Sequence, residues 1–357
     1  MPVNIVRWTF AAIIAVTSSV SASAAADAVN YCSRLKSSGY EHAVVLSKVT
    51  PNYPKNELNR TGEGWVKFLA TVSPEGVPVD ITVDDAVGGG TFIKISRDTL
   101  AKWRFAPARQ ADRRVFEYGR RFAFEFRFDQ EMGAYKEVVI LRYKRARAFL
   151  IERDPKKAIE ELDFALRFPM TIYERSMASY LLALAHFQLQ DMDAALLHVR
   201  HALFHEGHYL EKGPLSEALA LGVILESEAG NYIEALCDFQ TLRKRDSAKA
   251  AEQETAELAA DMIQLIDNQA PILIAAKISP APAEDTVPSW RHLLLRERFA
   301  FSQLPAEPLK FRLMCSFTLV EDVAVKNKIW SLPPGARSCE IRVIGPVAAA
   351  FEFAEIR

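Results

Sequence analysis

The stretch that decides the first folded region is Gly64-Trp65-Val66-Lys67-Phe68-Leu69-Ala70-Thr71-Val72. Every second residue from Val66 onward is apolar, which predicts a β-strand with one buried face. The residues Ser73-Pro74-Glu75-Gly76 follow and are typical of a tight turn. The next stretch alternates as well and is expected to complete an antiparallel hairpin. Its inward residues are expected to be Val79, Ile81 and Val83, and its outward residues Pro78, Asp80, Thr82 and Asp84.

Two further elements are expected to cover this hairpin. Residues 92–103 carry Ser96, Leu100 and Trp103 at helical spacing, which predicts a short amphipathic helix. Residues 122–128 alternate phenylalanine with other residues, which predicts a strand whose rings form core against that helix. Gly88-Gly89-Gly90 lacks the spacing of a phosphate-binding loop, and we interpret it as a flexible connection.

An ordered set of motifs spans residues 45–130. Its members are Pro51-x-Tyr53-Pro54, Glu63-Gly64-Trp65-Val66, the turn at 73–76, Trp103-Arg104-Phe105-Ala106-Pro107-Ala108 and the strand at 122–128. In this order they resemble the C-terminal domain of the TonB family. The resemblance implies a small antiparallel sheet backed by helices, which binds a short extended peptide of an outer-membrane receptor along an exposed strand edge. The side chains expected to flank that edge, between Arg120 and Phe128, are Arg121, Ala123, Glu125 and Arg127.

The first 26 residues have the layout of a secretory signal peptide. Arg7 precedes an apolar run at residues 8–16, and two small-residue cleavage sites end at Ala24 and Ala26. We therefore expect a periplasmic protein. An uncleaved signal that acts as an inner-membrane anchor is the alternative.

Residues 137–267 predict an α-solenoid of about three helix-turn-helix repeats. The frame around Ala235 is similar to the second helix of a tetratricopeptide repeat, and it recurs around Ala195 and Ala158 at intervals of 40 and 37 residues. Small residues are needed where paired helices approach closely. A last helix at 251–265 is expected to cap the stack. The resemblance implies a surface that binds protein partners.

Proline-rich residues 268–288 are expected to form a linker. A small β module is expected to follow at 289–357, built as one compact antiparallel sheet of three or four strands. Cys315 and Cys339 both fall in predicted strands of this module. In an oxidising compartment they are expected to form a disulfide. Cys32 and Cys237 are expected to stay unpaired.

Composition and motifs argue against catalysis and nucleic-acid binding. The formal net charge is -1, which gives no basic footprint for phosphate groups. No nucleophile-elbow, zinc-protease, nucleotide-binding or C-x-x-C motif occurs. We predict no enzymatic activity and no cofactor. One histidine cluster is interpreted as a histidine-rich surface face without an assigned metal: His198, His201, His205 and His208.

Together these features predict a multidomain α+β protein of the cell envelope that binds protein partners without catalysis. The preferred function is peptide binding by strand addition in TonB-linked outer-membrane transport. The family's energy transducers carry a Pro-rich spacer before this domain, whereas Pro2 is the only proline before Pro51 here. The alternative is therefore a periplasmic tetratricopeptide scaffold in which the TonB-like domain is only structural.

Overall fold

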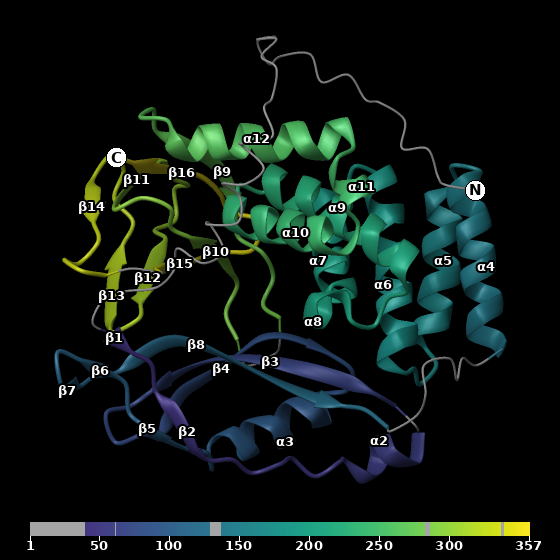
Figure 1. Cartoon of the computed structure of the whole chain (residues 1–357), viewed down its shortest axis with the longest axis horizontal. Coiled ribbons are helices and arrows are strands. Elements are labelled where there is room, and N and C mark those ends of the chain that lie inside the picture. Colours follow the sequence, from purple (N-terminus) through teal and green to yellow (C-terminus); the bar gives the residue numbers. More distant parts are fainter. Residues whose placement is uncertain (1–39, 61, 129–136, 283–285, 337–338) are drawn as a thin grey trace.

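The computed structural model describes residues 40–60, 62–128, 137–282, 286–336 and 339–357. Figure 1 shows three neighbouring regions: an N-terminal region (residues 40–128), a helical region (137–267) and a C-terminal region (272–356). The expected signal peptide lies outside the described residues. Among the described helices, none combines the length and apolar character that a membrane span requires.

The N-terminal region is built on an antiparallel sheet in the order β4-β3-β8. Its strands are β3 (Gly64–Val72), β4 (Pro78–Val87) and β8 (Glu117–Phe126), and α3 (Gly90–Leu100) covers one face (Figure 1). The smaller elements are β1 (Tyr40–Glu41), β2 (Val44–Ser47), α2 (Lys55–Arg60), β5 (Arg104–Ala106), β6 (Arg109–Gln110) and β7 (Arg113–Arg114). Strand β2 pairs with β5, and β1, β6 and β7 form a small sheet of their own.

Apolar packing holds α3 against the sheet. The Phe92 ring stacks on Phe126 with centroids 4.4 Å apart. Gly88 has a positive φ of 115°, and a Cβ atom there would lie 2.8 Å from the Phe92 ring. The expected flexible connection is therefore wrong at this position, because Gly88 is required for close packing and Gly90 already begins the helix.

The helical region contains three packed helix pairs, namely α4 with α5, α6 with α7, and α9 with α10. Ala158, Ala195 and Ala235 are fully buried, as close helix approach requires. The helices are α4 (Glu137–Ile151), α5 (Pro155–Leu166), α6 (Ile172–Gln188), α7 (Met192–Ala202), α8 (Phe204–Gly207), α9 (Lys212–Glu228), α10 (Tyr232–Arg245), α11 (Ser247–Ala250) and α12 (Gln253–Asp267). Asp154 and Asp191 cap the second helices of the first two pairs, since each side chain accepts a backbone hydrogen bond three residues on.

The C-terminal region consists of two four-stranded sheets, ordered β10-β15-β12-β13 and β14-β11-β16-β9. The strands are β9 (Ile272–Lys277), β10 (Ser289–Leu293), β11 (Arg298–Gln303), β12 (Lys310–Cys315), β13 (Thr318–Val323), β14 (Ile329–Ser331), β15 (Glu340–Ile344) and β16 (Ala350–Ile356). Two expectations need correction: there are two sheets rather than one, and the expected linker contains β9. Ile272, Ile274 and Ala276 alternate inward in β9, a signal that the surrounding prolines masked.

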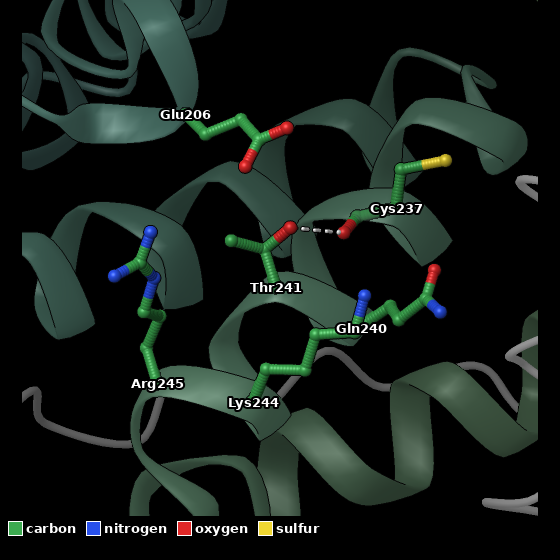
Figure 2. A pocket seen from close by; sticks show the side chains of 6 residues that line it. All are labelled: Glu206, Cys237, Gln240, Thr241, Lys244 and Arg245. Atoms are coloured by element: carbon green, nitrogen blue, oxygen red, sulfur yellow. Dashed lines mark hydrogen bonds between the residues drawn. The ribbon is translucent and has the colours of Figure 1, made fainter.

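The expected disulfide between Cys315 and Cys339 is present, with the two Cα atoms 4.1 Å apart and both residues buried. Cys237 on α10 is also disulfide-bonded, so the expectation that it stays unpaired is wrong. It is half-buried and lines a surface pocket (Figure 2). Cys32 lies outside the described residues.

Candidate protein-binding edge

Strand β8 is an edge strand of the described sheet, with β3 on one side and no strand on the other. The N–H of Phe128 donates to Glu63, the residue just before β3, over 2.8 Å. Backbone groups of successive residues point alternately toward and away from the neighbouring strand. The N–H and C=O groups of Phe122, Phe124 and Phe126 therefore face β3. Those of Arg121, Ala123 and Glu125 face the open side.

The beginning of this edge is occupied by the C-terminal region. The β3–β8 pairing shifts register between Glu117 and Arg120, so the alternation described above holds only from Arg120 onward. Before this shift, the N–H of Tyr118 faces the open side and donates to the carbonyl of Ser316 over 3.0 Å. Phe317, in the same turn between β12 and β13, packs near Tyr40 with ring centroids 5.7 Å apart. The open part of the edge consequently starts after Tyr118.

The four side chains expected to flank the edge have different surroundings. Ala123 is exposed beside the open edge. Glu125 lies 3.8 Å from His205, and its hydrogen bond with Tyr209 contributes, after burial, to a raised pKa of that tyrosine. Arg127 lies 3.5 Å from Glu125. The contacts of Glu125 with His205 and Tyr209 join the end of β8 to the helical region.

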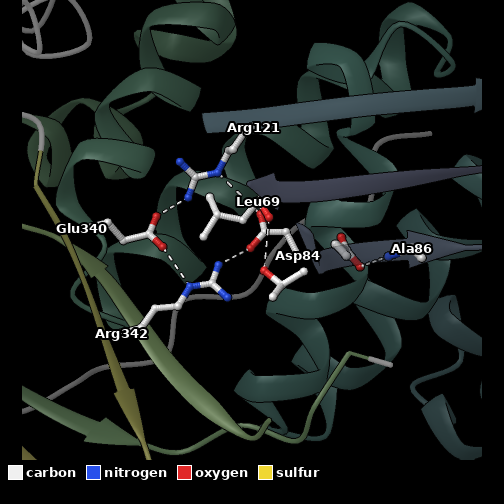
Figure 3. Close-up of polar contacts among 8 residues, drawn as sticks. Leu69, Asp84, Ala86, Arg121, Glu340 and Arg342 are labelled. Atoms are coloured by element: carbon white, nitrogen blue, oxygen red, sulfur yellow. Dashed lines mark hydrogen bonds and ion pairs between the residues drawn. The ribbon is translucent and has the colours of Figure 1, made fainter. Parts of the chain in front are cut away.

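Arg121 points away from the edge. Its side chain crosses above Leu69 of β3, and it forms ion pairs with Asp84 of β4 and Glu340 of β15 (Figure 3). Arg121 therefore joins the N-terminal and C-terminal regions, and its guanidinium is not directed toward an added strand.

Figure 3 shows that these groups form a closed ring in which Arg342 bridges Asp84 and Glu340. The Asp84 and Glu340 side chains are 8% and 6% exposed. Burial alone would raise the pKa of Asp84, but Arg291, Arg121 and Arg342 outweigh burial and hold that pKa well below its usual range. The same balance, led by burial against Arg121 and Arg342, lowers the pKa of Glu340. Both carboxylates are thus stabilised in the charged form.

The sequence pattern missed this charged face because β4 contains a bulge. Lys67 pairs with Asp85 and Phe68 with Val83, so Asp84 is the extra residue. A bulge lets two consecutive side chains point to the same face. Asp84 and Asp85 both meet the rest of the protein here, and Asp85 lies 3.0 Å from Nε2 of His201. Asp84 was expected to face solvent, but it lies in the interface between the N-terminal and C-terminal regions.

The helical region also covers this face with aromatic rings. Trp65 stacks on Phe204 with centroids 4.3 Å apart and an interplanar angle of 6°. The chain then continues through three left-handed residues, with φ of 50° at His205, 56° at Glu206 and 71° at Gly207. Left-handed conformations are costly for residues other than glycine. This turn ends the helical run that began with α7 and positions the Phe204 ring against Trp65 of the sheet.

The left-handed turn also separates His198 and His201 from His205, so these histidines do not share one continuous helix face. His198 stacks on His186 of α6, with centroids 5.3 Å apart, and meets His201 at 6.2 Å. His205 instead lies near Glu125. His186 was missed because it belongs to another helix. Among the described residues, no group of three metal-binding side chains has a geometry that could hold a metal ion.

The N-terminal region is thus a small antiparallel sheet with one helix-covered face, and its edge strands are β4 and β8. Residues 49–128 match the family described as Gram-negative bacterial TonB protein C-terminal. The chain is similar to the solution NMR structure of the Pseudomonas aeruginosa TonB CTD, with 27% identity and a TM-score of 0.21, over 27% of this chain and 94% of that one. No curated protein matches the chain. The matched family is non-enzymatic and indicates a protein-interaction role in the periplasm or envelope.

Proposed function

We propose that this protein binds an extended segment of a partner protein by strand addition to β8. The observation that carries the proposal is the open side of β8 in a region that matches the TonB C-terminal family. Backbone groups of Arg121, Ala123 and Glu125 are the docking groups. Each hydrogen bond made there contributes about 1 kcal/mol net, and a pre-ordered edge lowers the entropic cost of binding.

The partner we propose is a periplasm-facing peptide of an outer-membrane receptor, which places the protein in TonB-linked transport. The ion-pair ring and the Trp65–Phe204 stack support a fixed orientation of the edge relative to the other two regions. In this proposal the protein presents a docking edge that is held rigidly by its other two regions. In the family's energy transducers, by contrast, the domain follows a long Pro-rich spacer.

The test uses the exported full-length chain and short synthetic peptides that correspond to periplasm-facing segments of outer-membrane receptors. Glu125→Pro removes one outward N–H, so peptide affinity should fall at least tenfold by fluorescence anisotropy. Glu125→Ala is the matched control, because it loses the same side chain and keeps the N–H. Equal affinity in both variants, with unchanged circular dichroism, would reject this edge.

A second candidate function is a periplasmic scaffold in which the helical region binds the partner and the TonB-like sheet is structural. The face of the sheet opposite α3 is covered by the other two regions, for example through the Asp84–Arg342 ion pair. This burial favours a structural role for the sheet. The tetratricopeptide-like pattern supports a binding role for the helices, and its buried alanines let the helix pairs pack closely. Envelope partners that cross-link to the helical region, and are retained by Glu125→Pro, would favour the scaffold.

A further inference from the structure

An exposed apolar strand lies at one end of the N-terminal region. Among the described strands β2 pairs with β5 alone, and only two residues separate β5 from the β6–β7 hairpin (Figure 1). All four residues of β2 are exposed, and Val44 and Leu46 are 62% and 70% exposed. Val49 and Phe116, which follow β2 and β7, are exposed as well. A contiguous group of exposed apolar residues marks an interaction surface in soluble proteins.

Exposed cations surround this strand. They follow β2, flank the start of β5 and occupy the β6–β7 hairpin: Lys48, Lys102, Arg104, Arg109, Arg113 and Arg114. Within the residues that the structure describes, none of the six takes part in an ion pair. Residues 41–49 and 101–114 together carry a formal charge of +4, from six cations and two anions, whereas the whole chain carries -1. The positive charge is therefore concentrated at this end of the molecule.

The β6–β7 hairpin holds two of these arginines in a repulsive position. Arg109 and Arg114 are directly opposite each other in the strand register, and like charges in such positions are destabilising. The turn between them is tight, because Ala111 and Asp112 both have positive φ, of 47° and 64°. The guanidinium of Arg109 donates to the carbonyl of Asp112 over 3.0 Å, which leaves its charge in place. An anionic partner would offset this repulsion.

We propose that β2, Val49, Phe116 and the six cations form a surface, the β2 surface, that binds the headgroup layer of an anionic phospholipid bilayer. Cations attract anionic headgroups, and exposed apolar side chains enter the boundary between headgroups and acyl chains. The matched family indicates a protein of the envelope, a compartment that bilayers enclose. The proposal does not depend on the peptide function proposed for β8.

Charge decides between a bilayer and the other occupants of this surface. A second copy of the chain would bring the same cations against one another, because its own β2 surface carries them too. A neutral partner would leave the cations without compensation. An acidic protein would compensate them but would also have to present apolar groups to Val44 and Leu46. A bilayer surface offers anionic and apolar groups together.

The proposal is tested by cosedimentation of the exported full-length chain with vesicles of equimolar phosphatidylglycerol and phosphatidylcholine. The wild type should bind these vesicles roughly tenfold more tightly than vesicles of phosphatidylcholine alone, because neutral headgroups do not attract the cations. Binding should weaken as salt is added, since ions screen the attraction. Equal binding to both kinds of vesicle, or no binding to either, would overturn the proposal.

The cations are tested with Arg113→Gln combined with Arg114→Gln, which should weaken binding to the anionic vesicles roughly tenfold. The matched control is Arg145→Gln combined with Arg147→Gln, which removes the same charge from exposed positions of α4. This control should bind within roughly twofold of the wild type, because its charges lie outside the β2 surface. Equal losses in the two variants would mean that net charge alone attracts the protein, and the β2 surface would be rejected.

The apolar part is tested with Leu46→Ser, which should weaken vesicle binding roughly threefold through the lost apolar contact. Leu141→Ser on α4 is its control, since Leu141 is also exposed. Circular dichroism checks that each variant is folded. Poly-L-glutamate is the competing probe: if the wild type bound it and neither kind of vesicle, the surface would belong to an acidic protein and the bilayer proposal would fail. Glu125→Pro should leave vesicle binding unchanged, so this proposal and the one for β8 fail separately.

Discussion

The two faces of the N-terminal sheet are built from opposite chemistry. The face toward α3 is a continuous apolar core that includes Phe68, Phe92 and Phe124. The opposite face carries Asp84, Asp85 and other charged groups that meet partners from the helical and C-terminal regions. Apolar burial is non-directional and drives folding, whereas buried ion pairs tolerate only one geometry. We infer that the first face stabilises the sheet and the second orients it.

The C-terminal region explains why acidic residues are needed on that second face. Arg342 lies between Arg291 and Arg312 on neighbouring strands, so three arginines stand side by side. Like charges directly opposite one another are destabilising. Asp84 and Glu340 offset the repulsion at Arg342. The docking of the two regions is therefore electrostatically specific.

The largest effect is expected on the apolar face. Phe68 is fully buried, so Phe68→Ala should lower the free energy of unfolding by about 4 kcal/mol, through lost burial and a cavity. Urea denaturation followed by circular dichroism measures the change. Phe68→Leu is the control and should cost roughly 1 kcal/mol. A loss below that of the control would contradict the core assignment.

The next effect is expected in the ion-pair ring. Arg342→Met leaves Asp84 and Glu340 short of positive charge and should cost roughly 3 kcal/mol. Adding Asp84→Asn should restore part of the stability, because it removes one unpaired charge. Urea midpoints of the four proteins in the double-mutant cycle report the coupling. Strict additivity would mean that the two side chains do not interact.

A pH effect is expected where the helices approach the sheet. Burial, together with His201 and His186, lowers the pKa of His198 to about 4. Because the folded value lies below the ordinary 6.5, the unfolded chain binds the proton more readily, and this contribution to stability is lost as pH falls from 6.5 toward 4. Between pH 7 and pH 5 the wild type should lose about 2 kcal/mol more than His198→Gln. Parallel pH profiles in urea titrations would contradict this.

The smallest effect is expected at the exposed ion pair of Lys277 with Asp193, whose side chains are 54% and 73% exposed. Solvent screens such pairs, so Lys277→Ala should leave the urea midpoint unchanged within error. A shift as large as that of Arg342→Met would remove the distinction between buried and exposed pairs on which the comparison rests.

The elements with strong local patterns could be predicted from the sequence. Alternation marks β3 and the core rings of β8, and turn residues mark the hairpin between β3 and β4. Spaced alanines mark the helix pairs. These signals are local because burial on one face imposes a period of two in strands and close helix contacts require small residues. The disulfide between Cys315 and Cys339 followed from their predicted strands and compartment.

The charged interface and the final form of the candidate edge were decided only by tertiary structure. A bulge in β4 turned Asp84 and Asp85 to one face, and Arg121 reached across β3 to Glu340 instead of toward the edge. A one-residue irregularity reverses every side chain that follows it, and the alternating pattern does not reveal where it falls. Ion pairs between residues hundreds of positions apart leave no periodic trace in the sequence. They depend on which faces meet once each region has folded.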